Sequence, residues 1–165
     1  MLVMGIDPGL SRCGYGVVRQ KGRVVEAMAA GIIRTDKREP IPRRLHEFQN
    51  ELVELLDAYR PDAVAIEQVL FQVNVRTAMG VGQASGVAMA AAVGAGAEVF
   101  EYSPTQIKKA VTGWGGADKE QMGKMVQTLL GLPRPLRPAD AADAVAAALC
   151  HLAHRPAASR IQAAM

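Results

Sequence analysis

Four acidic residues stand at boundaries between segments of different hydrophobic pattern. Asp7 ends a short apolar run and precedes a Pro-Gly pair, and Glu67 ends a second apolar run. Asp140 and Asp143 stand three residues apart at the start of an alanine-rich segment, so they share one face of the helix predicted there. Carboxylates are the hard oxygen ligands that Mg²⁺ prefers. Two divalent ions about 4 Å apart can activate water and stabilise the leaving oxygen in phosphodiester hydrolysis. The four acids together predict a metal site for phosphate chemistry.

Each acid also has a purely structural interpretation. Asp7 alone could be a turn residue before the Pro-Gly pair, and Asp140 alone could be a helix N-cap. Glu67 is harder to explain in this way, because a charged residue that ends an apolar strand is seldom buried without a function. Strand ends of an α/β sheet open onto a common crevice, and the first turn of a helix favours negative charge. A shared metal site therefore explains the set better than four separate structural roles.

The hydrophobic pattern predicts an α/β protein. Residues 2–6, 14–20 and 23–33 are predicted to be strands joined by short links, which favours an antiparallel meander with a bulge in the third strand. A strand that follows a helical crossover is most often parallel to its neighbour. After the meander, the pattern predicts helix 40–59, strand 63–67, helix 74–95, strand 98–102 and helices 104–113, 118–130 and 139–154. We therefore expect a five-stranded mixed sheet with helices on both faces.

The composition favours one domain of ordinary size. The chain has 165 residues, half of them hydrophobic, and a net charge of +3. We expect a single domain over residues 1–155 and a disordered tail over 156–165. The sequence contains no strongly apolar run of membrane-spanning length, begins directly with a strand pattern, and has two distant cysteines that fit a reducing compartment. These features predict a cytoplasmic protein, and a mildly basic surface around an acidic pocket suits a phosphate-backbone substrate.

Six segments carry a resemblance to a known family. They are Gly5–Gly9, Ile66–Val69, Gly82–Gly86, Gln106–Lys108, Gly113–Lys119 and Asp140–Ala144. In this order they span nearly the whole chain, which resembles the RuvC family of bacterial Holliday-junction resolvases. The resemblance implies an RNase H-like fold and a homodimer that nicks two opposed strands of a four-way DNA junction, in recombination and DNA repair.

The same resemblance implies a cofactor, partners and a location. It implies two Mg²⁺ ions in each active site, and the sequence leaves open whether Mn²⁺ can replace them. It implies a nucleoid-associated cytoplasmic protein that acts with the branch-migration proteins RuvA and RuvB. Carried over by position, the catalytic, metal-binding acids are Asp7, Glu67, Asp140 and Asp143.

Five further residues are candidates for DNA binding. Lys108 and Lys119 match basic positions that the family uses near the scissile phosphate, and a lysine is a mobile point charge suited to phosphate. The family commonly places an aromatic residue three positions after the catalytic glutamate, but here that position is Leu70 and the aromatic Phe71 follows it. Leu70 could wedge between bases, Phe71 could take over the stacking, or both could be core or dimer contacts. Arg76 is a candidate phosphate or base contact.

Two other patterns allow a structural interpretation. Small residues recur every fourth position along the helix predicted over 74–95, at Ala78, Gly82, Gly86, Ala90 and Gly94. Because glycine costs helix stability, this ridge indicates close approach of another backbone. We expect part of the ridge to pack on the sheet or a neighbouring helix and the rest to contact a second subunit.

His151 and His154 stand near the end of the last predicted helix. His151 is eight residues past Asp143, roughly 12 Å along a helix, which is too far to share the same ions. We therefore expect both histidines to decorate the helix C-terminus, where positive charge is favoured. Cys13 and Cys150 are expected to be packing residues.

Other functions remain to be weighed against junction resolution. Another RNase H-like metal-dependent nuclease, such as one acting on RNA–DNA hybrids, would share the acids. An ATP-binding phosphotransferase of the sugar-kinase type would need a second lobe, for which 165 residues leave no room. A junction-binding protein without catalysis would not need four intact acids.

Overall fold

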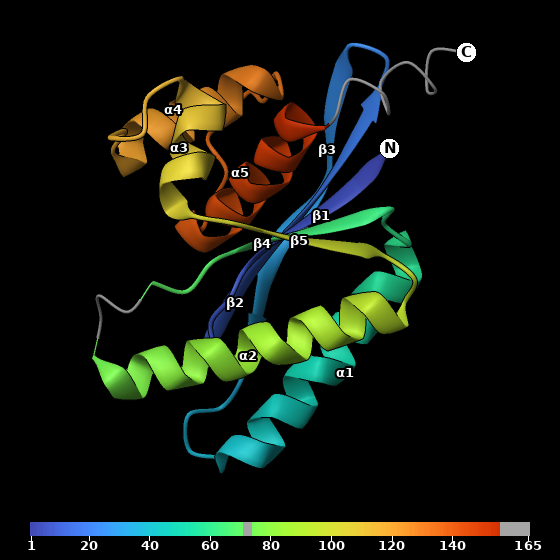
Figure 1. The fold of residues 1–165 in the computed structure, drawn as a ribbon, viewed down its shortest axis with the longest axis vertical. Helices are drawn as coiled ribbons and strands as arrows, with labels where there is room; N and C mark the ends of the chain where they lie inside the picture. The colour runs from blue at the N-terminus through green and yellow to red at the C-terminus, as the bar shows by residue number, and fades with distance from the viewer. Residues whose placement is uncertain (71–73, 156–165) are drawn as a thin grey trace.

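The structure is a computed structural model that describes residues 1–70 and 74–155 (Figure 1). In chain order its elements are β1 (Leu2–Asp7), β2 (Arg12–Lys21), β3 (Val24–Arg34), α1 (Ile41–Tyr59), β4 (Ala63–Glu67), α2 (Val75–Gly94), β5 (Glu98–Tyr102), α3 (Pro104–Thr112), α4 (Lys119–Leu129) and α5 (Ala139–His154). The predicted order is confirmed, and most predicted boundaries shift by only one or two residues. The tail expected to be disordered, 156–165, lies outside the described residues.

Within the described residues, five strands form one mixed sheet in the order β3-β2-β1-β4-β5. The short link after Lys21 makes β2 and β3 antiparallel, whereas α1 carries the chain across so that β4 runs parallel to β1. The predicted bulge is confirmed as a register shift opposite Val17 and Val18. The strand β2 begins two residues earlier than predicted, because Arg12 and Cys13 still pair with β3.

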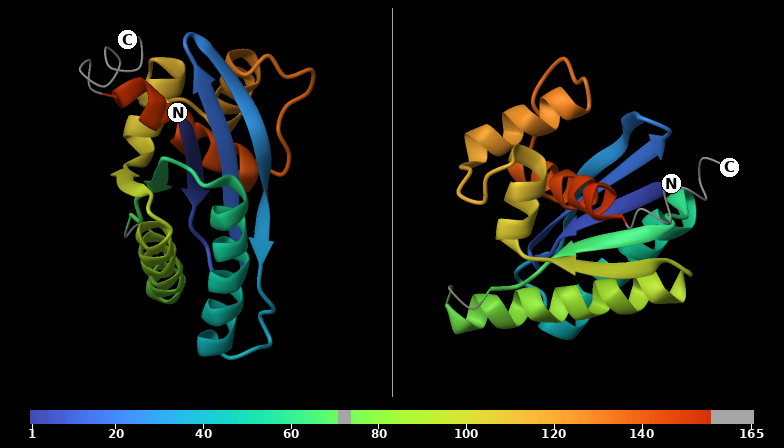
Figure 2. Two further views of the ribbon diagram at one scale, coloured as in Figure 1. Left: turned by 90° about the vertical axis from the view of Figure 1, so that its right-hand side faces the viewer. Right: turned by 45° about the horizontal axis from the view of Figure 1, so that its top comes forward.

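Two helical layers enclose the sheet. Helices α1 and α2 lie on one face, and α3, α4 and α5 lie on the other (Figure 2). Along β1 the side chains alternate between the faces, as the pleat requires. Met4 and Ile6 join the core with α1 and α2, whereas Val3 joins the core with α5. This arrangement confirms the predicted five-stranded mixed sheet with helices on both faces, the RNase H-like architecture that the resemblance implied. None of the described helices is both long and apolar enough to cross a bilayer.

Helix α5 lies unusually close to the sheet because glycines face it. A Cβ atom at Gly5 would overlap the carbonyl oxygen of Ala144, and one at Gly14 would overlap the carbonyl oxygen of Asp140. A Cβ at Gly16 would strike the side chain of Val145. Glycine therefore permits the backbone of α5 to rest directly on β1 and β2, which fixes the height of the helix above the strand ends.

Only one end of the small-residue ridge of α2 is buried. Ala78 is buried, whereas Gly82, Gly86, Ala90 and Gly94 are exposed, and the expected contact of these residues with a second subunit stays a prediction. A Cβ built at Gly82, Gly86 or Gly94 would meet nothing within 4 Å. The face of α2 that packs on the sheet is a different one, made by Ala84, Ala88, Ala91 and Ala92.

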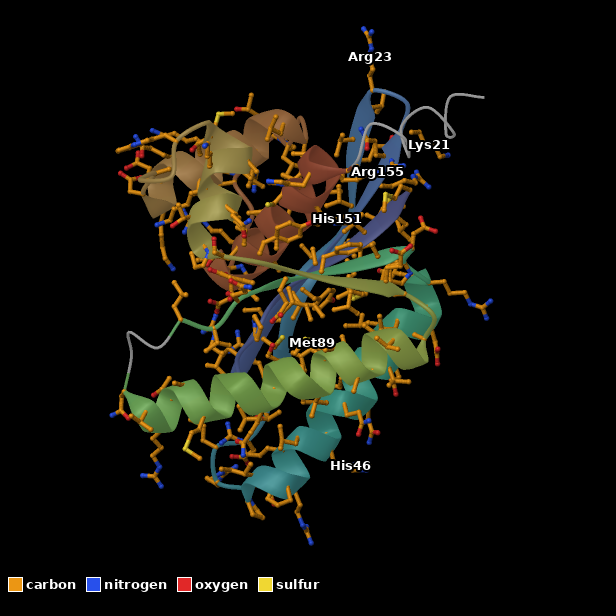
Figure 3. The ribbon with its side chains drawn as sticks, in the orientation of Figure 1. Lys21, Arg23, His46, Met89, His151 and Arg155 are labelled. Carbon is orange, nitrogen blue, oxygen red and sulfur yellow. The ribbon has the colours of Figure 1, made fainter. Side chains whose placement is uncertain are left out.

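The expectation that His151 decorates the helix surface is wrong. Its side chain is buried, its Nδ1 lies 2.7 Å from the hydroxyl of Tyr102, and its ring centroid lies 4.4 Å from that of Phe100 (Figure 3). The last turns of α5 pack against β5, so burial decides the position of this residue and the helix dipole does not. His154 is exposed near the helix end, and Cys13 and Cys150 are buried packing residues as expected.

Candidate active site

The fold brings the four acids to one edge of the sheet. Asp7 and Glu67 are the last residues of β1 and β4, whose parallel register pairs Ile6 with Ile66. Asp140 and Asp143 lie in the first turns of α5, which packs over β1 and β2. All four line one pocket of about 480 Å³. The sequence prediction that these acids converge is therefore correct.

Three of the acids lie close enough to share a metal ion. One carboxylate oxygen from each of Asp7, Asp140 and Asp143 lies within 4.8 Å of the other two. Glu67 is outside this group of three but lines the same pocket and shares a side-chain hydrogen bond with Asp7. Crowded oxygen ligands at partly buried positions fit a hard divalent cation. The described residues thus contain an acidic cluster that can hold a metal.

Three of the four acids have pKa values above their ordinary values. Burial, followed by the negative charges of its neighbours, raises the pKa of Asp7 from 3.8 to about 8. Burial is also the main cause of the raised pKa values of Glu67 and Asp143. Like charges held together at low solvent exposure favour the protonated forms unless a cation joins them. The electrostatics therefore favour binding of a positive ion.

Two lysines stand beside the acids. The Nζ atom of Lys119 lies 3.7 Å from Oδ2 of Asp143, and both Lys119 and Lys108 line the acid pocket. Both lysines lower the pKa of Glu67 and Asp143, opposing burial. Lys119 is held at the first position of α4 by a capping box in which Asp118 and Gln121 bond to each other's backbone N–H groups. The structure places both lysines beside the acids, and their DNA-binding role stays a prediction.

Arg12 is a site residue that sequence analysis missed. Its Nε atom lies 3.0 Å from Oδ2 of Asp140, although 128 positions separate the two residues in the chain. Nothing in its spacing distinguishes Arg12 from the other arginines, and only the docking of α5 over the start of β2 brings it to the acid. Asp140 therefore has a cationic partner that no local pattern reveals.

The other predicted DNA-binding residues lie away from the acids. Leu70 is 47% exposed, so the interpretation of this residue as core is wrong. Arg76 is exposed in the first turn of α2, and its backbone N–H donates to the Asn74 side chain over 2.9 Å. Phe71 lies outside the described residues. In the described part of the chain the acid pocket is lined by other residues, so the structure brings neither Leu70 nor Arg76 to the acids.

Comparison with known proteins agrees with this geometry. The family model for crossover junction endodeoxyribonuclease RuvC matches residues 3–151. A RuvC from Salinispora arenicola is 51% identical over 165 residues, covering 99% of this chain and 94% of the relative, and one from Parafrankia sp. is 50% identical, covering 99% and 93%. The structure of Thermus thermophilus RuvC in complex with a Holliday junction substrate superposes with a TM-score of 0.88 at 37% identity, covering 99% of this chain and 97% of that one. The chain therefore belongs to the RuvC family of crossover junction endodeoxyribonucleases.

Proposed function

We propose that this protein resolves four-way DNA junctions by paired, symmetric nicks that depend on Mg²⁺. The observation that carries the proposal is the convergence of Asp7, Asp140 and Asp143 beside Glu67, in a chain that matches RuvC relatives over nearly its full length. The T. thermophilus relative was solved with a Holliday junction bound, which supports the same substrate here.

The residues of the pocket divide the chemistry between them. Asp7, Glu67, Asp140 and Asp143 would hold two Mg²⁺ ions, which when bound activate water and stabilise the leaving oxygen. Asp7 interacts with all three other acids and is therefore the centre of the set. Lys108 and Lys119 flank the carboxylates and attract the phosphate backbone that the acids alone would repel. The resemblance implies products with a 5′-phosphate and a 3′-hydroxyl.

Paired nicking requires two active sites, and we propose that a homodimer supplies them. The exposed ridge of α2, formed by Gly82, Gly86, Ala90 and Gly94, offers a smooth surface on which a second copy can pack closely. A two-fold dimer presents two acid pockets to a two-fold substrate, so symmetric cleavage follows from the geometry.

The remaining features of the proposal concern its cellular setting. We propose one nuclease domain over residues 1–155 that works in the cytoplasm at the nucleoid, together with RuvA and RuvB. We also propose that Leu70, Phe71 and Arg76 bind DNA, since Leu70 is exposed three residues after Glu67 and Arg76 is exposed in the first turn of α2. The support for these points is family membership.

A nicking assay tests the proposal. Labelled synthetic four-way junction is incubated with the protein with and without Mg²⁺, beside a linear duplex of the same sequence and an RNA–DNA hybrid. We expect paired nicks in the junction alone and only with metal. Asp7→Asn should abolish nicking while junction binding survives, whereas Asp57→Asn, at an exposed position on α1, should cut normally. Preferential cutting of the hybrid would instead support the alternative RNase H-like nuclease. Wild-type cutting by Asp7→Asn would refute the assignment of the acids.

A further inference from the structure

The loop between α3 and α4 displays the chain's only tryptophan. Trp114 is 60% exposed. Its backbone is nevertheless fixed, because its N–H donates to Oγ1 of Thr112 over 3.2 Å and its carbonyl oxygen accepts from the N–H of Ala117 over 3.3 Å. Oγ1 of Thr112 also lies 3.0 Å from the same carbonyl oxygen. The large aromatic side chain is thus exposed to solvent on a backbone that hydrogen bonds hold in place.

Gly116 provides a support for the tryptophan ring. A Cβ atom at Gly116 would lie 2.7 Å from Cζ2 and 2.8 Å from Cε2 of Trp114, closer than such atoms approach in proteins. The indole therefore lies against the Gly116 backbone, while Trp114 as a whole stays 60% exposed. An exposed ring that is held against backbone is arranged for stacking.

The depression beside Trp114 adjoins the acid pocket. Trp114 lines a shallow depression of about 310 Å³ together with Ala117, Gln121 and Lys124. Ala117 also lines the acid pocket. Lys124 also lines the neighbouring cavity beside α4 and α5, whose lining includes Lys119 and Asp143. A DNA strand that extends from the acids along α4 can therefore reach both Lys124 and the exposed ring.

The cation beside the ring is available for a phosphate. Lys124 pairs with Glu120 at 2.8 Å, but the two side chains are 71% and 77% exposed. Exposed ion pairs of this i,i+4 kind contribute little to stability, so an incoming phosphate can replace the carboxylate. An aromatic ring next to basic side chains is the combination that binds single-stranded nucleic acid, because every base has a face on which an aromatic can stack.

We propose that Trp114 is a DNA-binding residue whose indole stacks on an unpaired base of the substrate strand that leaves the acid pocket, with Lys124 at the adjoining phosphate. This inference rests on the proposed function, since it assumes a DNA substrate at the acids. It adds a proposed base-contacting residue in the loop between α3 and α4, separate from Leu70, Phe71 and Arg76.

The single tryptophan makes a direct test practicable. Metal-free protein is titrated with a four-way junction, and indole emission is excited at the red edge of its absorption, where DNA absorbs little. We expect strong quenching that saturates with binding, and weaker quenching by a fully paired duplex at equal occupancy. Unchanged emission at saturating junction would overturn the proposal. An emission change on raising protein concentration without DNA would overturn it too, because it would place the ring in a protein interface.

Three variants separate stacking from general packing. Trp114→Ala should weaken junction binding about ten-fold, as loss of one base–aromatic stack does, and should raise KM more than it lowers kcat. Trp114→Phe should recover most of the affinity. Gly116→Ala keeps the tryptophan but pushes its ring from the support, so it should weaken binding and alter quenching. As a control, Leu129→Ala removes another exposed apolar side chain, at the far end of α4, and should bind normally.

The outcomes test the stacking role of Trp114 separately from the proposed nuclease activity. If Trp114→Ala binds as tightly as wild type while both nick the junction, the stacking role is refuted and the nuclease stands. If wild type itself fails to nick with Mg²⁺, the proposed function fails independently of the fluorescence result.

Discussion

The Nε atom of Arg12 lies 3.0 Å from Oδ2 of Asp140, which ties the start of β2 to the first turn of α5. The arginine side chain is 46% exposed, so solvent screens most of its charge. Its main effect on the acid is therefore orientation, because a bonded guanidinium fixes the rotation of the carboxylate.

Replacing Arg12 should consequently impair metal binding. Partners that orient a metal-ligating side chain contribute about 10–100-fold to metal affinity or activity. We expect Arg12→Gln to raise the Mg²⁺ concentration for half-maximal nicking about ten-fold, with a parallel weakening of Mn²⁺ binding measured by calorimetry. Arg12→Lys should not retain wild-type metal affinity, because lysine keeps the positive charge but lacks the planar guanidinium group that orients Asp140. A lower Mg²⁺ requirement in Arg12→Gln would show instead that repulsion between the Arg12 charge and the metal ion outweighs the orienting effect of Arg12 on Asp140.

Asp7 should make the metal-free protein less stable as pH rises. Its pKa is 3.8 when unperturbed and about 8 in the folded protein, so between these values the folded state binds a proton that the unfolded state has lost. The free energy of unfolding therefore falls as pH rises through this window. In EDTA at neutral pH, Asp7→Asn should melt several degrees higher than wild type, each kcal/mol being worth roughly 2–4 °C.

Two controls accompany the melting experiment. Near pH 4 the two proteins should melt at more similar temperatures, because the unfolded state then also binds much of the proton that folded Asp7 keeps. Adding Mg²⁺ should raise the melting temperature of wild type more than that of Asp7→Asn, because the ligand stabilises only a state that binds it. Equal melting temperatures at neutral pH in EDTA would contradict the electrostatic strain inferred for the cluster.

Gly14 should not tolerate a side chain. A Cβ there would overlap the carbonyl oxygen of Asp140, which is backbone and cannot swing aside. We expect Gly14→Ala to destabilise the protein by about 1–3 kcal/mol through overpacking and to displace Asp140. Chemical denaturation and metal titration together measure both effects. Gly123→Ala is the matched control, because a Cβ there meets nothing within 4 Å in the interior of α4, and alanine should stabilise by about 0.5–1 kcal/mol.

The buried His151 should lower stability in acid. Burial lowers its pKa, with the charges of Arg155 and His154 acting in the same direction and that of Glu98 opposing them. Below pH 6.5 the histidine of the unfolded state binds a proton, whereas buried His151 does not. The free energy of unfolding therefore decreases as pH decreases, until the pH reaches the lowered pKa of folded His151.

Comparison with His151→Gln isolates this contribution. Between pH 7 and 5, the free energy of unfolding should decrease more for the wild type than for the variant. This comparison does not depend on how the two free energies differ at pH 7. Tyr102→Phe should cost about 1–3 kcal/mol at neutral pH, because it leaves Nδ1 of the buried ring without its hydrogen-bond partner. Parallel pH profiles for wild type and His151→Gln would refute the protonation argument.

The sequence was sufficient for the framework of the fold and for the four acids. Short links fix antiparallel pairing, a helical crossover fixes parallel pairing, and acids that end parallel neighbours must share an edge. Asp7 and Glu67 could be placed together for this reason. These rules are local or topological, so one sequence carries them.

Contacts that depend on how α5 docks could not be predicted in the same way. The pairing of Arg12 with Asp140 and the approach of Gly14 to the same helix join segments more than 120 positions apart. His151 was misplaced because the dipole argument considered only the helix terminus. The nearly unbroken run of small and apolar residues from Ala144 to Cys150 signals a helix buried on all sides.

The acid pocket draws on both ends of the chain. Asp7 comes from the first strand, and Asp143 comes from a helix that begins at Ala139. During synthesis, a chain that still lacks its last helix holds only two of the four carboxylates, and on separate strand ends. Under the proposed function, the chain can therefore cut DNA only after the C-terminal helix has docked, and a product of translation that lacks this helix should have no nuclease activity.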